Sequence, residues 1–87
     1  MWTEEAVANL DAISAYIMAF NPAAARHLAE RLIAVAESLR EFADRGRDTG
    51  GGMREMPTVR PYILRYRMTA DTVFILRIRH SARSVED

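Results

Sequence analysis

Four arginines and one histidine are the residues whose side chains could do chemistry, and all five lie between Tyr62 and His80. They are Arg65, Arg67, Arg77, Arg79 and His80. Guanidinium groups recognise carboxylates and phosphates through paired hydrogen bonds, which suits an anionic partner such as an acidic peptide or a nucleic acid. The imidazole is the one group of this stretch that could transfer a proton near neutral pH.

The sequence gives little support for a metal site, a cofactor site or a phosphate-binding loop. The chain has no cysteine, and its two histidines, His27 and His80, are far apart in sequence, so we expect neither a metal site nor a cofactor. The glycine run Gly50–Gly52 is not followed by Lys-Ser or Lys-Thr and follows no predicted strand, which excludes a phosphate-binding P-loop.

Charge is distributed unevenly along a chain whose net charge is zero. Residues 1–45 contain four arginines and seven acids, hence −3, whereas residues 46–87 contain eight arginines and five acids, hence +3. All twelve basic residues are arginine. A basic surface on an otherwise neutral domain favours an anionic partner, although a solvated face without a partner remains the alternative.

The arginines belong to a predicted β-hairpin, in which Tyr62–Met68 and Thr72–His80 flank the polar break Thr69–Asp71. Strict alternation, with Met68 opposite Thr72, assigns a core face and a second, open face. The predicted core face carries Tyr62, Leu64, Tyr66, Met68, Thr72, Phe74, Leu76 and Ile78. The predicted open face carries Ile63, Arg65, Arg67, Val73, Ile75, Arg77 and Arg79. Because that face mixes aliphatic residues with arginines, we expect a partner to cover it.

Two helices precede the hairpin. Thr3 is a good cap for the first helix, and its apolar stripe is Val7, Leu10, Ile13, Ile17 and Phe20. Asn21 and Pro22 end this helix and start the second. The second stripe is Ala25, Leu28, Leu32, Val35, Leu39 and Phe42. So short a joint predicts a helical hairpin.

Between the helices and the hairpin, residues 44–52 predict a mobile loop, and Met53–Met56 a short strand ended by Pro57. After His80 the tail is expected to be irregular. The order predicts one domain, residues 1–87, of class α+β with two layers, in which an antiparallel helix hairpin packs on a small antiparallel sheet of about three strands. No apolar run could span a bilayer and no signal segment opens the chain, so we expect a soluble, cytoplasmic protein without membrane contact.

The joint pattern of these segments resembles the RelE/ParE toxins of bacterial type II toxin–antitoxin modules, in particular the ParE-like branch. The matching stretches are WTEEAVANLDAISAYI at Trp2–Ile17, NPAAA at Asn21–Ala25, GR at Gly46–Arg47, MREM at Met53–Met56, RPYILRYR at Arg60–Arg67 and VFILRIRHSAR at Val73–Arg83. Members usually carry a first β-strand that ends at the tryptophan, whereas here the tryptophan is Trp2. We therefore expect a RelE/ParE toxin fold that lacks most of its first strand.

The resemblance implies a toxin that a ParD-like antitoxin neutralises in a hetero-oligomeric complex, by masking the open sheet face, with nucleic acid bound only through the antitoxin. The implied antitoxin-binding residues are Ile63, Arg65, Arg67, Val73, Ile75, Arg77 and Arg79. ParE-like members are linked to inhibition of DNA gyrase and have no bond-breaking chemistry of their own. RelE-like members are ribosome-dependent mRNA endoribonucleases.

A ribonuclease needs a base for the 2′-hydroxyl, an acid for the leaving oxygen and cations for the charged intermediate. Arg65 and Arg77 could supply the cations and His80 the proton transfer. However, alternation places His80 on the core side with Ile78, where a histidine is more often structural. We therefore predict a non-enzymatic toxin that acts on gyrase, with no catalytic residue, and keep the ribonuclease with Arg65, Arg77 and His80 as the alternative.

Overall fold

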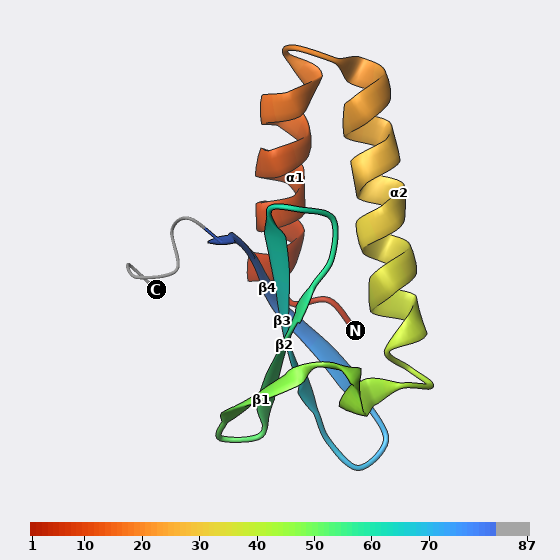
Figure 1. Ribbon diagram of the computed structural model, residues 1–87, viewed down its shortest axis with the longest axis vertical. Helices are drawn as coiled ribbons and strands as arrows, with labels where there is room; N and C mark the ends of the chain where they lie inside the picture. The colour runs from red at the N-terminus through yellow and green to blue at the C-terminus, as the bar shows by residue number, and fades with distance from the viewer. Residues whose placement is uncertain (82–87) are drawn as a thin grey trace.

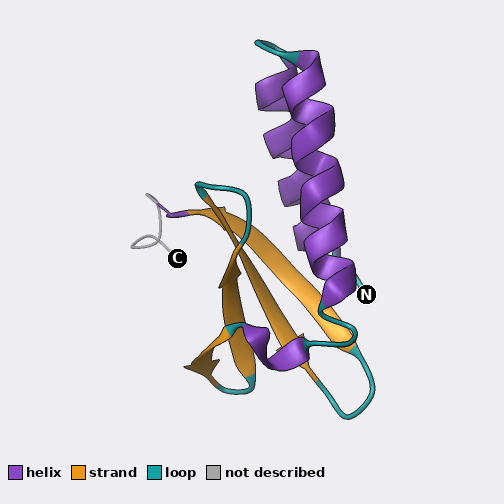
Figure 2. Cartoon of the chain, turned by 45° about the vertical axis from the view of Figure 1, so that its right-hand side comes forward, coloured by secondary structure: helices purple, strands orange, loops and turns teal. Residues whose placement is uncertain are grey.

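The fold has two layers, a helix pair on one side and a four-stranded antiparallel sheet on the other, as predicted except for the number of strands (Figures 1 and 2). The structure is a computed structural model that describes residues 1–81. The helices are α1 (Glu4–Met18) and α2 (Pro22–Ser38), followed by the short 3₁₀ helix η1 (Ala43–Arg45). The strands are β1 (Arg47–Gly50), β2 (Met53–Pro57), β3 (Tyr62–Met68) and β4 (Val73–His80), and neighbours in the chain are neighbours in the sheet. The irregular tail expected after His80 falls mainly on residues 82–87, outside the described part.

Both helices begin at the predicted caps. The Thr3 hydroxyl accepts a hydrogen bond from the Ala6 N–H at 3.2 Å, and the Asn21 Oδ1 accepts one from the Ala24 N–H at 3.1 Å. These side chains satisfy N–H groups that have no partner inside the first turn of a helix. Within residues 1–81, neither helix is long and apolar enough to cross a membrane.

The helix hairpin projects beyond the sheet, so the apolar residues at its projecting end have no opposing layer to pack against (Figure 2). Leu28, Leu32 and Leu39 are buried in the core, as predicted. In contrast, Phe20 at the projecting end is 75% exposed. Val7 and Phe42, also predicted core residues, are exposed as well, but they lie at the opposite end of the helix pair, so the overhang does not account for them. An amphipathic pattern identifies the apolar side of a helix but does not say how far along it the opposing layer extends.

The loop predicted for residues 44–52 is instead η1 and the edge strand β1, which pairs with β2 through a register that places Arg47 opposite Glu55. The glycines Gly50–Gly52 all have positive φ angles, so they build the tight turn between these strands rather than a flexible linker. The start of β1 is pinned by buried Tyr66, whose hydroxyl accepts a hydrogen bond from the Gly46 N–H at 2.9 Å. A Cβ at Gly46 would lie 2.5 Å from that hydroxyl oxygen, so this contact requires glycine.

The predicted register of the β3–β4 hairpin is wrong by one residue at the turn, where Met68 pairs with Val73 instead of Thr72, and by a bulge farther along β4. Arg65 pairs with Arg77 but Tyr66 pairs with Ile75, so that Leu76 is an extra residue in β4. The bulge reverses the faces of the preceding residues: Val73 and Ile75 pack in the core, and Phe74 lies opposite Arg67. Strict alternation would have left these two aliphatic residues in water, whereas the bulge lets Ile75 and Ile78 both face the helices.

The N-terminal residues lie along the edge of β4 and pair with it through a single bridge, which is consistent with the expected loss of most of the family's first strand. Trp2 forms a parallel bridge with Ile75, the Thr3 N–H donates to the Ile75 carbonyl at 3.0 Å, and the Ile75 N–H donates to the Met1 carbonyl at 2.8 Å. Farther along the same edge, the Asn9 side chain accepts from the Ile78 N–H at 3.0 Å. Part of the β4 edge is thus covered by the chain itself.

Candidate functional site: an arginine face organised by a buried glutamate

The open face of the sheet carries a row of charged residues, one from each strand. Arg47, Glu55, Arg65 and Arg77 are paired in register across β1, β2, β3 and β4. The predicted register, with Met68 opposite Thr72, would set Arg65 opposite Ile75, whereas Arg65 and Arg77 are in fact direct cross-strand partners. Like charges in that position repel unless an opposite charge lies close by.

Glu55 supplies that opposite charge. Its carboxylate accepts hydrogen bonds from Arg65 Nη2 at 2.7 Å and Nε at 3.0 Å, and from Arg79 Nη2 at 2.9 Å and Nε at 3.2 Å. Arg47 approaches the same carboxylate at 3.6 Å. We call these four residues the Glu55 cluster: one carboxylate with three guanidinium groups, for a net charge of +2.

The four side chains of the cluster differ in how deeply they are buried. The Glu55 side chain is 5% exposed, that of Arg79 is 10% exposed and that of Arg65 is 27% exposed, whereas Arg47 is 76% exposed. A buried charge is tolerated only when it is paired and hydrogen-bonded. Glu55 therefore holds Arg65 and Arg79 in fixed positions, while Arg47 stands at the rim.

The arginines keep Glu55 ionised. Hydrogen bonds from Arg79, and then from Arg65, lower the pKa of Glu55 from its ordinary value of 4.5 to about 2, although burial acts in the opposite direction. A carboxylate with so low a pKa is a poor proton acceptor at neutral pH. Its role in this geometry is that of a counter-ion that positions two cations.

Apart from Ile63, which pairs with Arg79, the remaining predicted face residues divide into three groups. Arg77 lies nearer the N-terminal turn of α1, where its Nε is 3.7 Å from a carboxylate oxygen of Glu5. Arg67 is exposed on the open face beside Phe74, an aromatic residue that the predicted register had assigned to the core. Val73 and Ile75, predicted for the open face, belong to the core instead.

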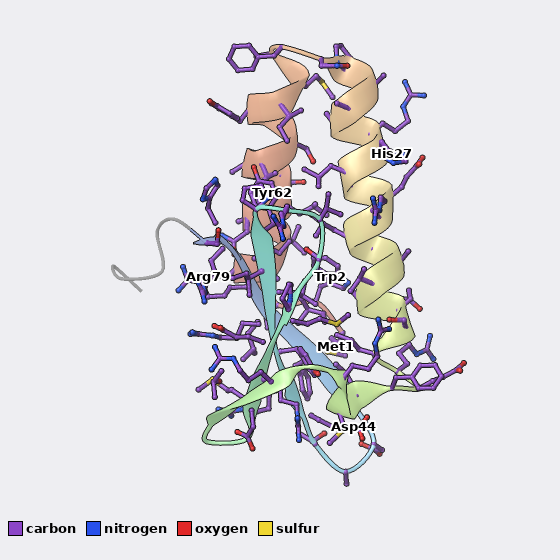
Figure 3. All side chains as sticks on the ribbon, viewed as in Figure 1. Met1, Trp2, His27, Asp44, Tyr62 and Arg79 are labelled. Atoms are coloured by element: carbon purple, nitrogen blue, oxygen red, sulfur yellow. The ribbon has the colours of Figure 1, made fainter. Side chains whose placement is uncertain are left out.

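The histidines lie away from the arginine face. His80 pairs with Tyr62 at the end of the sheet, and their rings meet edge to face with centroids 5.6 Å apart. The same two rings line a cavity with Ala12, Ile13 and Tyr16 of α1. His80 therefore faces the helix layer, as strand alternation predicted. His27 is exposed on α2, on the far side of the molecule from Arg79 (Figure 3). No group of three metal-ligating side chains gathers within residues 1–81.

Glu55 is the site residue that sequence reasoning missed. A strand was predicted at Met53–Met56 and extends to Pro57 in the structure, and alternation within it separates Glu55 from the core-facing Met56. A lone acid on the outward side of a strand, in the basic half of the chain, is a signal for a counter-ion. The register that brings it to Arg65 and Arg79 could not be read from the sequence.

A small cavity lies beside the cluster. Its volume is about 280 Å³, and its walls are Arg45, Arg47, Glu55, Pro57, Ile63 and Arg79. Three of these residues are cationic, one is anionic and two are apolar. The cavity therefore combines a net positive charge with an apolar wall.

Comparisons with known proteins agree on one family. Residues 1–85 match the family model described as the ParE toxin of the type II toxin–antitoxin system parDE. The chain is 46% identical over 83 residues to Toxin RelE2 of Caulobacter vibrioides, covering 95% of this chain and 94% of that toxin. It is 38% identical over 63 residues to Toxin RelE3 of the same organism, covering 69% of this chain and 68% of that toxin.

A solved structure has the same fold. A chain of the chromosomal ParDE toxin–antitoxin system from P. aeruginosa superposes with a TM-score of 0.79 at 26% sequence identity, over 91% of this chain and 90% of that chain.

Proposed function

The chain belongs to the ParE toxin family of type II toxin–antitoxin systems, and on that premise we propose that it arrests growth by inhibiting DNA gyrase and is neutralised by a ParD-like antitoxin. The proposal concerns the target and the neutralising partner. The toxin would act in the cytoplasm, where gyrase and the antitoxin are found.

The observation that carries the proposal is the pairing of the arginines with Glu55. A phosphodiester-cleaving site needs a general base whose pKa lies near the working pH and within hydrogen-bond reach of the 2′-hydroxyl. Glu55, with a pKa of about 2, is a poor base, and His80 faces α1 and Tyr62 instead of the arginines. Residues 82–87, Ala-Arg-Ser-Val-Glu-Asp, contain no histidine, tyrosine or lysine. The face is therefore suited to binding rather than to bond cleavage.

The antitoxin proposal rests on the composition of the same face. Ile63 and Phe74 lie among Arg65, Arg67 and Arg79, a mixture that suits a peptide segment with both apolar and acidic residues. The ParDE structure with the same fold is described as a toxin–antitoxin system, which supports a hetero-oligomeric complex for this chain as well. After correction for the bulge, the proposed contact residues are Ile63, Arg65, Arg67, Phe74, Arg77 and Arg79.

The alternative is a ribosome-dependent mRNA endoribonuclease with Arg65, Arg77 and His80 as its chemical groups. Two relatives named RelE toxins favour it. The geometry supports this alternative less well, because His80 faces the helix layer whereas the arginines lie on the opposite face of the sheet.

One preparation can separate the two targets. The purified toxin is added to a gyrase supercoiling assay and, in parallel, to translating ribosomes that carry a defined message. We expect supercoiling to be inhibited and the message to stay intact, and the antitoxin to restore gyrase activity. Codon-specific cleavage with unimpaired gyrase would overturn the proposal.

A further inference from the structure

The cavity beside Glu55 has the chemistry of a receptor for one acidic side chain. Arg45, Arg47 and Arg79 contribute three positive charges against the single negative charge of Glu55, and Pro57 and Ile63 form an apolar wall. At about 280 Å³ it is smaller than the roughly 300–1,000 Å³ of sites that hold free small molecules. Its size and lining suit the end of a side chain.

The arginines around this cavity are not equally available. Arg79 and Arg65 each donate two hydrogen bonds to Glu55, and Arg45 donates one to the Ser38 hydroxyl at 2.9 Å. Arg47 approaches Glu55 only at 3.6 Å, and its side chain is 76% exposed. Arg47 can therefore turn toward an incoming anion without leaving Glu55 unpaired.

We propose that this cavity receives a glutamate or aspartate of the antitoxin, and that Arg47 is the residue that captures it. The inference rests on the proposed antitoxin function and names the contact that anchors the partner. Glu55 acts as a positioning residue, because it holds Arg79 at the wall of the cavity. Arg47 then forms a charge-assisted pair with the incoming carboxylate.

A peptide carboxylate fits the surroundings better than a nucleic-acid phosphate. A nucleic acid presents a phosphate at every nucleotide and needs a continuous stripe of uncompensated cations. Here the stripe is interrupted by Glu55 and by the apolar residues Pro57 and Ile63. A cavity that accepts one anion beside an apolar wall matches a peptide segment, which can present a single carboxylate next to apolar side chains.

The chain offers a matched control for Arg47. Arg40 is 74% exposed and is paired with one glutamate, Glu37, at 3.2 Å, but it lies beyond the end of α2 and outside the cavity. Both arginines can be replaced with little risk to folding. Loss of one charge-assisted hydrogen bond to the partner is expected to weaken binding about tenfold, which corresponds to about 1.4 kcal/mol.

The test measures binding by calorimetry between the full-length toxin and the antitoxin encoded in the reading frame beside its gene. We expect Arg47→Ala to weaken binding about tenfold and Arg47→Glu more strongly, whereas Arg40→Ala and Arg40→Glu stay within about twofold. Circular dichroism should show the same fold in all four variants.

Each other outcome points elsewhere. Equal affinity of the Arg47 and Arg40 variants would overturn the cavity assignment while leaving antitoxin neutralisation intact. Failure of the unaltered toxin to bind the antitoxin would instead overturn the proposed function itself. A single-stranded U12 RNA that binds the unaltered toxin and is lost only in Arg47→Glu, with antitoxin binding unchanged, would replace the peptide by a nucleic acid.

Discussion

The two faces of the sheet are stabilised by different interactions. The helix-facing side is apolar, with Leu64 and Tyr66 fully buried against α1 and α2. The open side buries a carboxylate and part of two guanidinium groups through hydrogen bonds. Apolar burial is non-directional and tolerates small shifts, whereas a buried ion cluster fixes the direction of each side chain. The comparison suggests that the first face supplies stability and the second a preorganised surface.

The largest expected effect comes from adjacent residues that point to opposite faces. Leu64→Ala removes a buried side chain and leaves a cavity, so we expect it to lower the free energy of unfolding by about 3 kcal/mol. Ile63→Ala, on the half-buried open face, should cost about 1 kcal/mol. Urea denaturation of both variants measures the difference. Equal losses would mean that the two faces do not differ in their contribution to stability.

The next effect concerns the ion cluster. Glu55→Gln removes the carboxylate that Arg65 and Arg79 share, and we expect it to lower the free energy of unfolding by about 2–3 kcal/mol at pH 7. This is less than for a fully buried pair, because Arg65 is 27% exposed. Glu37→Gln, which breaks an exposed pair with Arg40, should change stability by less than about 0.5 kcal/mol. Thermal and urea unfolding at pH 7 test both variants.

The contribution of Glu55 to the free energy of unfolding should disappear at low pH. The folded-state pKa of Glu55 is about 2, below its ordinary value of 4.5, so the unfolded chain takes up the proton first. The stabilisation is thus fully present above about pH 4.5 and is lost as the pH falls through about 2. Unfolding curves of the unaltered protein and Glu55→Gln should converge across this window. A constant gap between them would show that the carboxylate is not what stabilises the cluster.

These two faces also explain how far the sequence could be read. The caps Thr3 and Asn21 depend on neighbours within three residues, so they were predicted correctly. The helix pair followed from its apolar stripes and short joint, and the α+β class from the order of helices and strands. The bulge at Leu76 depends on which residues of β4 the helices require, which is a property of the packed structure. The faces of Val73, Phe74 and Ile75 were therefore assigned wrongly.

The site was predictable in kind but not in arrangement. Arginines on an open sheet face could be inferred from strand alternation, and Arg65, Arg67, Arg77 and Arg79 were predicted as contact residues. Their contact role remains a prediction. The cluster itself depends on the pairing of β2 with β3 and of β1 with β2. The pairing of β1 with β2 is made through the glycine turn at Gly50–Gly52, in a segment that was predicted to be a mobile loop.

The smallest expected effect tests whether His80 belongs to the chemistry or to the helix-facing layer. His80→Gln removes an edge-to-face contact with Tyr62, which is worth about 0.5–1.5 kcal/mol beyond burial, and leaves the arginine face untouched. Tyr62→Leu breaks the same ring pair from the other side and is the matched control. If His80 is structural, both variants should lose similar stability, and growth arrest on expression without antitoxin should fall in parallel with it. A proton-transferring His80 predicts something different: His80→Gln would abolish toxicity and message cleavage, while Tyr62→Leu, equally destabilised, would retain both.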